Sequence, residues 1–202
     1  MEPEIWPDIA RSFQMAAAAA DQDAKSLLPA NEMSRLQGGV FALCTSAAGS
    51  SNAPTWFYEH YRELLTTHCQ RIIADQVGSM TGNPLLDQFQ RSWTRYGRLV
   101  KRFNVIFSYL DQFYTAKTHS MGSTPPTLAE LTQGCFRTHV LEPRKALLLA
   151  AVQGISQLEL GTAEPDRASV LRLLEGRYGQ TFGDYLTESL YPSPKPEDEP
   201  RP

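Results

Sequence analysis

Apolar residues repeat with the spacing of an α-helix along most of the chain, and no segment shows the strict apolar-polar alternation of a half-buried strand. The clearest stretch begins at Phe57, where charged side chains occupy the face opposite the apolar one. Its apolar face consists of Phe57, Tyr61, Leu64, Leu65, His68 and Ile72. The pattern predicts an amphipathic helix in this stretch and an all-α protein as a whole.

Clusters of glycine, proline and serine divide the helical pattern into segments. We expect a loop at residues 47–54, breaks at 78–84 and 121–126, and an N-cap at Thr127. Roughly eight or nine helices would then form a bundle or a stack of helical hairpins. The expected helices are residues 3–21, 30–46, 57–72, one from about 84, 97–117, and those holding Leu128, Leu147, Val170 and Phe182.

Composition narrows the classes of function. The 202 residues carry a net charge of −3, so no chain-wide basic field attracts nucleic acid, and no apolar run approaches the length of a membrane span. The opening Met1-Glu2-Pro3-Glu4 is acidic where a secretory signal is basic. Three widely spaced cysteines suggest free thiols in a reducing compartment. We expect a location in the cytoplasm, the nucleus or both, with no membrane or nucleic-acid partner.

Motifs for phosphate, dinucleotide and zinc-protease chemistry are missing from the sequence, and we expect neither a cofactor nor a metal. Two histidine-cysteine pairs deserve weighing, because a thiol near an imidazole suits metal binding or catalysis. They are His68 with Cys69, and Cys135 with His139. A core histidine and a half-buried thiol are the stronger interpretation. A small helical enzyme or metal-binding protein using these pairs is kept as an alternative.

Two expected helices carry a second stripe of side chains, separate from the stripe that faces the core. Val105, Tyr109 and Gln112 form one such stripe, and Ser34, Gln37 and Phe41 form the other. Two stripes of this kind can present a joint surface to a partner protein, with aromatic rings as anchors. The alternative is that Phe41 and Tyr109 only widen the buried face.

Residues 93–117, WTRYGRLVKRFNVIFSYLDQFYTAK, resemble the fifth helix of the first cullin repeat, in which a W-x-x-Y pair precedes K-x-x-N-x-I-x-x-Y-L. Other segments agree in order: Ile5-Trp6, VFALCTS at 40–46, the helix at 57–73, FRTHV at 136–140, and the stretch from 170 to 191. The resemblance covers residues 4–191, and its specificity lies in this shared order. The matching positions of the fifth helix are Trp93, Tyr96, Lys101, Asn104, Ile106, Tyr109, Leu110 and Tyr114.

The resemblance implies a cullin-repeat-like helical bundle. A five-helix repeat would occupy residues 1–160, the start of a second repeat or capping helices 161–191, and a disordered tail 192–202. Cullins are non-catalytic scaffolds of ubiquitin ligases whose second and fifth helices bind an adaptor of the Skp, BTB or elongin type, or a β-propeller protein. By this resemblance the adaptor-binding residues would be Met33, Ser34, Gln37, Phe41, Val105, Tyr109 and Gln112.

The sequence departs from the cullin pattern in two respects. Gln37 stands where cullins commonly have tyrosine. Gly38 and Gly39 follow it, and each glycine in a helix interior lowers helix stability by about 1 kcal/mol relative to alanine. The half of a cullin that binds the RING subunit and carries the NEDD8-accepting lysine has no counterpart in these residues. A fragment of a full cullin and a short cullin-like protein both fit, and the acidic, proline-rich tail favours the second. Another alternative is a regulatory cullin-like protein without ligase activity, acting on a kinase or transcription complex.

Overall fold

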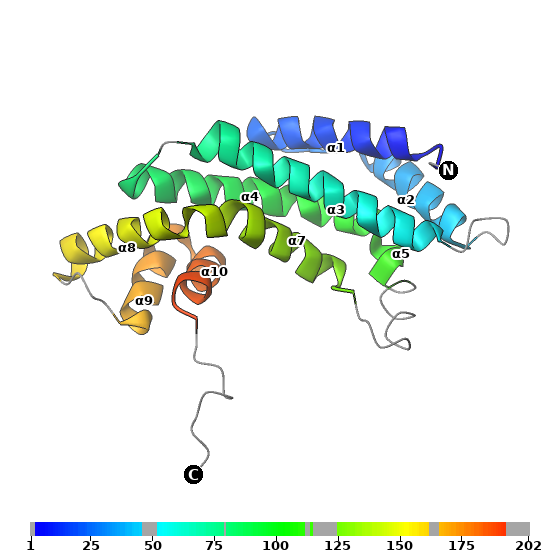
Figure 1. The fold of residues 1–202 in the computed structure, drawn as a ribbon. Coiled ribbons are helices and arrows are strands. Elements are labelled where there is room, and N and C mark those ends of the chain that lie inside the picture. Colours follow the sequence, from blue (N-terminus) through cyan, green and yellow to red (C-terminus); the bar gives the residue numbers. More distant parts are fainter. Residues whose placement is uncertain are drawn as a thin grey trace, which may run out of the picture. The chain divides into compact units, whose positions relative to one another are not determined.

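A computed structural model describes residues 3–45, 52–78, 80–111, 114, 125–161 and 166–192, and every regular element in these residues is a helix (Figure 1). The expectation of an all-α fold is confirmed. The α-helices are α1 (Trp6–Asp21), α2 (Ala30–Thr45), α3 (Ala53–Arg71), α4 (Gly82–Ile106), α5 (Ser108–Leu110), α7 (Leu128–Phe136), α8 (Lys145–Leu160), α9 (Arg167–Tyr178) and α10 (Gln180–Leu190). The π-helices η1 (Ile72–Val77) and η3 (Arg137–Leu141) extend α3 and α7, and the 3-10 helix η4 (Glu142–Arg144) leads into α8.

The chain divides into two compact units. The first comprises Met1–Ala74 and Thr94–Val140, and it contains α1, α2, α3, the second half of α4, α5 and α7. The second comprises Asp75–Trp93 and Leu141–Pro202, and it contains α8, α9 and α10. The repeat boundary expected near residue 160 is a different kind of division and stays a prediction.

Local sequence signals set several helix ends. Thr127 begins α7 with a capping box: its hydroxyl accepts from the Glu130 backbone N–H at 3.2 Å, and the Glu130 carboxylate accepts from the Thr127 N–H at 2.8 Å. Asp166 caps α9 by accepting from the Ser169 N–H at 2.8 Å. Gly161 ends α8 with a φ of 72°, a left-handed conformation that glycine adopts at little cost.

The expected separation of a helix starting near 84 from one spanning 97–117 is wrong. α4 contains the first of them and the start of the second, because it continues through Gly97 and ends at Ile106. Residues 112, 113 and 115–117 of the second lie outside the described residues. Gly97 is exposed, and the cost of one glycine is small beside the burial of its neighbours Tyr96, Leu99 and Val100. The helix is interrupted at Phe107, whose φ of −94° and ψ of 6° lie outside the helical range, and α5 follows directly.

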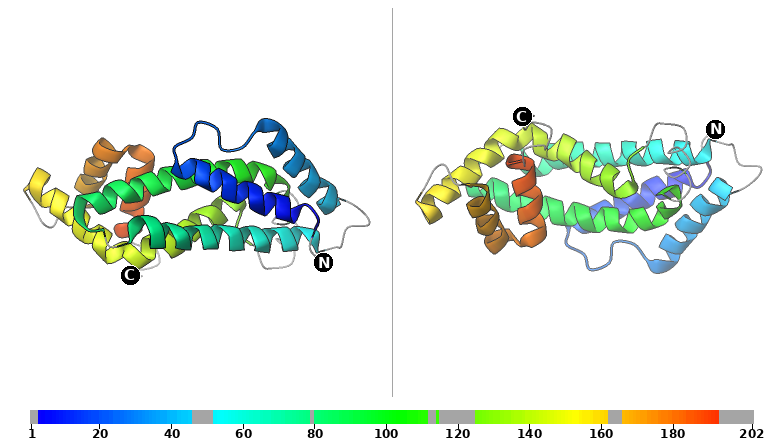
Figure 2. Two further views of the ribbon diagram at one scale, coloured as in Figure 1. Left: turned by 90° about the horizontal axis from the view of Figure 1, so that it is seen from above. Right: turned by 90° about the horizontal axis from the view of Figure 1, so that it is seen from below.

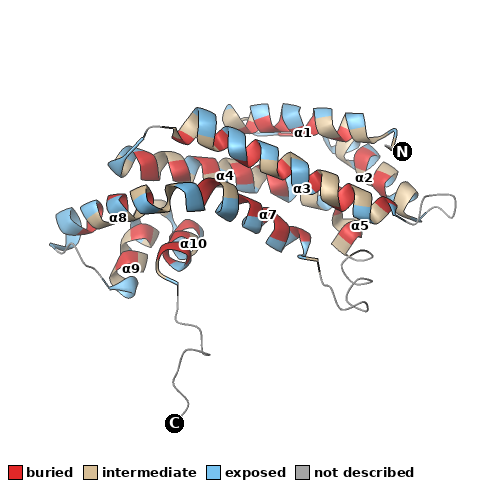
Figure 3. Cartoon of the chain, viewed as in Figure 1, coloured by how far each residue is buried: buried red, intermediate tan, exposed pale blue. Residues whose placement is uncertain are grey.

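The core of the first unit is aromatic. Tyr61 of α3 stacks on Phe107 with ring centroids 4.4 Å apart, and Phe13 of α1 meets Phe103 of α4 edge-on at 4.9 Å. Figure 2 shows α1 lying across α3 and the second half of α4, and Figure 3 shows that their facing sides are buried. The buried tyrosine hydroxyls are satisfied: Tyr61 donates to the Asn104 side-chain oxygen at 2.8 Å, and Tyr96 donates to the Thr132 carbonyl at 2.7 Å.

The second unit is held by close packing of α9 against α10. A Cβ on Gly183 would lie 2.9 Å from the backbone nitrogen of Glu175, so only glycine allows the two helices to approach this closely. Tyr185 of α10 stacks on Trp93 at 4.0 Å, and the Tyr178 hydroxyl donates to the Asp87 carboxylate at 2.9 Å. Both contacts join the C-terminal helices to the first half of α4 within this unit.

The glycine pair does not prevent α2 from forming, and its two members differ. Gly38 is exposed and has open space where a Cβ would point. A Cβ on Gly39 would instead collide with the Cδ1 of Ile5, the residue that precedes α1. Gly39 therefore lets the start of α1 pack directly against the α2 backbone, and Gly38 has no such role.

We expect Gly38→Ala to raise the free energy of unfolding by about 0.5–1 kcal/mol, because alanine favours the helix and meets no obstacle. Gly39→Ala should lose at least that gain, because the new methyl group forces Ile5 to move. Chemical denaturation of the two single variants measures the difference. The double variant Ile5→Ala/Gly39→Ala should recover part of the loss relative to Ile5→Ala alone, and strictly additive effects would contradict the proposed collision.

Candidate partner-binding surface

The two second stripes expected from the sequence lie side by side in the structure. α2 packs against α5 within the first unit, and the rings of Phe41 and Tyr109 meet edge-on with centroids 4.8 Å apart. The Gln37 side-chain amide donates to the Ser108 hydroxyl at 3.4 Å, one helical turn from that ring pair. These contacts join α2 to the segment that follows α4, at the end of the unit where Figure 1 labels α2 and α5.

Two apolar side chains at this place remain in contact with solvent. Phe41 is 50% exposed and Val105 is 42% exposed, whereas the neighbouring Phe103, Ile106 and Phe107 are fully buried. Large apolar side chains that stay exposed mark places that a partner can cover. Phe41 and Val105 are therefore not part of a widened core.

The remaining expected residues take mixed positions. Ser34 is exposed, while Met33, Gln37 and Tyr109 are half-buried. Gln112 lies outside the described residues. We call Met33, Ser34, Gln37, Phe41, Val105 and Tyr109 together the Phe41 surface.

Ser108 was missed by the sequence analysis, although it lies three residues after Val105. The break at Phe107 turns the chain, so the faces of α5 do not continue those of α4 in register. Its contact with Gln37 places a polar pair beside the aromatic one. A partner would thus meet both apolar area and hydrogen-bonding groups, the composition found at protein interfaces.

The Phe41 surface has no side chain that is charged at neutral pH. Behind it, Cys44 is half-buried, and burial raises the pKa of its thiol to about 11. The thiol is therefore protonated and behaves as a small apolar group. Covering the surface would cost little in desolvation of charge.

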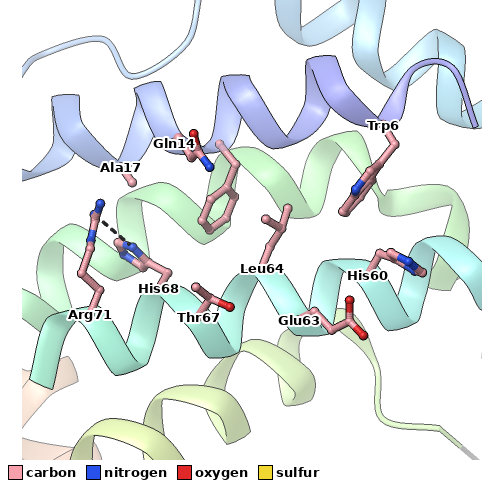
Figure 4. A pocket seen from close by; sticks show the side chains of 10 residues that line it. Trp6, Gln14, Ala17, His60, Glu63, Leu64, Thr67, His68 and Arg71 are labelled. Atoms are coloured by element: carbon pink, nitrogen blue, oxygen red, sulfur yellow. Dashed lines mark hydrogen bonds between the residues drawn. The ribbon is translucent and has the colours of Figure 1, made fainter. Parts of the chain in front are cut away.

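A separate groove of about 530 Å³ lies between α1 and α3 in the first unit (Figure 4). Phe13, Ala17 and Leu64 contribute apolar lining, and Trp6 and His60 stand at one end. The His60 ring stacks on Trp56 at 3.6 Å and meets Trp6 edge-on at 5.5 Å. His68 and Arg71 line the other end, where the Arg71 guanidinium donates to the Nδ1 of His68 at 3.3 Å.

His68 is a core histidine. It is 8% exposed, its ring stacks on Tyr96 and meets Phe13 edge-on at 5.7 Å, and its Nδ1 accepts from Arg71. Burial, with a smaller contribution from the positive charge of Arg71 and an opposing one from Asp21, lowers its pKa to about 4. The folded protein therefore contains His68 with a neutral imidazole.

The two histidine-cysteine pairs do not assemble into a reactive site in the part of the chain that the structure describes. Burial raises the pKa of Cys69 to about 12 and also raises the pKa of Cys135, so both thiols are held protonated. A metal ligand or nucleophile needs the thiolate instead. Among the described residues, histidine, cysteine and carboxylate side chains form no group of three that could hold a metal ion.

The fold is an all-α scaffold in which α2 and α5 bring an aromatic pair together at the surface. The sequence matches the family model of the cullin α-solenoid domain over residues 18–175, which is most of the chain. The chain belongs to the cullin family. Within the described residues, no helix combines the length and apolar character needed to cross a membrane.

A relative in Arabidopsis thaliana is named Cullin-like protein 3, and it is 19% identical to this chain over 170 residues. The alignment covers 84% of this chain and 63% of that relative. The chain therefore spans less than two thirds of the length of the relative it matches. The similarity extends well beyond the two helices of the Phe41 surface.

We expect the folded protein to lose stability as the pH falls from about 6.5 to about 4, because unfolded histidine binds a proton in this range and folded His68 does not. Below pH 4 the loss from this residue reaches about 3 kcal/mol, and above pH 6.5 it vanishes. Denaturant titrations at a series of pH values measure the slope. His68→Gln should flatten that slope by close to one proton, and equal slopes for His68→Gln and the wild type would contradict the assignment.

Proposed function

We propose that this chain is a non-catalytic scaffold that binds an adaptor protein through the Phe41 surface. The observation that supports this most directly is the contact between Phe41 and Tyr109, at 4.8 Å, together with the half-exposed Phe41 ring. An aromatic pair that bridges two helices and stays open to solvent is unfavourable in isolation. It becomes favourable when a partner buries it.

The arrangement suits binding because the rings are already in position. The edge-on contact limits the rotation of both side chains, so less conformational entropy is lost on association. The Phe41 surface is uncharged, and aromatic residues near the centre of an interface contribute most of its affinity. Gln37 and Ser108 supply a polar pair at the same place.

The kind of partner follows from family membership and from the matched positions. Cullin scaffolds bind adaptors of the Skp, BTB or elongin type, or β-propeller proteins, through the helices that correspond to α2 and the α4–α5 segment. We propose that this chain contributes the adaptor end of a cullin-type ubiquitin ligase in the cytoplasm or nucleus, and so acts in ubiquitin-dependent protein catabolism. The substrate-recruiting role would then belong to the adaptor.

Replacing both anchors tests the proposal. We expect Phe41→Ala/Tyr109→Ala to weaken binding to the cognate adaptor by at least about 30-fold, because truncating one aromatic anchor has an effect of this size. Calorimetric titration against purified adaptors of the Skp, BTB, elongin and β-propeller types, together with recovery of partners from cell extract, measures the loss.

The matched control is Leu158→Ala, which removes an apolar side chain that is 81% exposed on α8 and should leave adaptor binding unchanged. Circular dichroism and thermal unfolding establish that both variants fold. If the double variant and the wild type bind the same adaptor equally, the Phe41 surface is not the binding site.

A further inference from the structure

We infer that the Phe41 surface receives a protein segment in which acidic side chains flank an apolar anchor, because the two α4 residues next to Val105, Lys101 and Arg102, are basic and form no ion pair with any described residue. This inference deepens the proposed function and rests on it. It adds the chemistry of the bound segment, which neither the family match nor the aromatic pair specifies.

The basic character begins in the sequence. Residues 88–110 contain five basic side chains and no aspartate or glutamate, although the whole chain has a net charge of −3. The five are Arg91, Arg95, Arg98, Lys101 and Arg102. A one-signed stretch of this length in an acidic protein produces a local positive potential.

Internal contacts occupy two of these side chains. Arg95 forms a two-point ion pair with Asp23, with nitrogen-oxygen distances of 3.0 and 2.7 Å. Arg98 donates a hydrogen bond to the carbonyl oxygen of Ala24. Both bind the connection between α1 and α2 to α4, so their role is structural.

Lys101 and Arg102 are exposed, and neither forms an ion pair with any described residue. They precede Val105 by four and three residues. On a helix these spacings put side chains next to one another, about 5–6 Å apart at Cβ. Two positive charges that form no ion pair with the described residues therefore lie beside the exposed side chain of Val105.

Acidic groups on the facing helix do not neutralise this charge. The one acidic residue of α2 is Glu32, which accepts from Arg35 at 2.8 Å and from the Ser12 hydroxyl at 3.1 Å. Arg35 is also paired with Asp8 of α1 at 2.9 Å. Asp111, just after α5, accepts from the Leu128 backbone N–H at 2.8 Å and so caps the start of α7.

Acidic residues of a partner would pair with the positive charges of Lys101 and Arg102. Each exposed pair changes affinity by about two- to fivefold, and together they accelerate association and select against basic partners. A nucleic acid is the less suitable occupant, because its binding rests on many phosphate contacts and would leave Phe41 and Val105 uncovered. An acidic peptide with an apolar anchor uses both parts of the surface.

Selection from a random peptide library displayed on phage tests the inference without assuming an adaptor. The library is panned on four immobilised proteins: the wild type, Lys101→Glu/Arg102→Glu, Phe41→Ala, and the control Arg11→Glu/Arg172→Glu. Each charge reversal changes the net charge by −2, so both double variants fall from −3 to −7 and differ only in where the charge is placed. Peptides enriched on the wild type are then synthesised and titrated at about 50 and 300 mM salt.

The wild type and the control variant should enrich peptides that combine an aromatic or aliphatic residue with a net negative charge. Lys101→Glu/Arg102→Glu should bind the same peptides about tenfold more weakly at the lower salt, and the difference should shrink to about threefold at the higher salt. Enrichment of neutral or basic peptides, or equal weakening by the control variant, overturns the inference.

The remaining arms separate this inference from the proposed function. If Phe41→Ala loses binding and Lys101→Glu/Arg102→Glu does not, the Phe41 surface remains the binding site and only the preference for acidic peptides is overturned. Unchanged binding in Phe41→Ala overturns the proposed function itself. A single-stranded oligonucleotide is the last probe. If the wild type retains it, Lys101→Glu/Arg102→Glu does not, and no peptide is enriched, then the basic side chains bind nucleic acid and the inference is overturned.

Discussion

The packing of α2 against α3 and α5 within the first unit is the constraint on which the partner surface depends. α2 buries only Leu36 and Val40 fully, so few contacts fix its position. The contact of Ile5 with the α2 backbone is one of them, and the Gln37–Ser108 hydrogen bond is another. Because its buried face is narrow, α2 leaves most of its surface free, and the Phe41 ring remains in solvent beside Tyr109.

Burial also determines which chemical groups can act. His68, Cys69 and Cys135 are the residues with the most reactive side chains, and each is buried and uncharged at neutral pH. Burial keeps these side chains in their neutral forms, because a low-dielectric environment disfavours the charged forms that catalysis or metal binding uses. The features available for recognition are therefore on the outside of the helices, as in a scaffold.

The basic residues of α4 fall into two groups with different surroundings. Arg95 and Arg98 hold the α1–α2 connection, which positions α2, while Lys101 and Arg102 extend into solvent next to Val105. The basic residues with internal contacts thus precede, on the same helix, the two that extend into solvent. A change at Arg95 would act on binding indirectly, by displacing α2.

The sequence by itself determined the helical class, because the apolar spacing follows the helical period, and the N-cap at Thr127, because a cap and the backbone N–H that it satisfies are only three residues apart in the chain. It also placed Phe41 and Tyr109 on stripes separate from the core, and the order of the cullin-like segments pointed to the family. Only the tertiary structure decided that α4 continues past Gly97 and that the Ile5 side chain lies where a Cβ on Gly39 would point. It also decided that, among the described residues, Arg95 and Arg98 have internal partners whereas Lys101 and Arg102 form no ion pair. These outcomes depend on contacts between residues far apart in the chain, and local spacing carries no information about them.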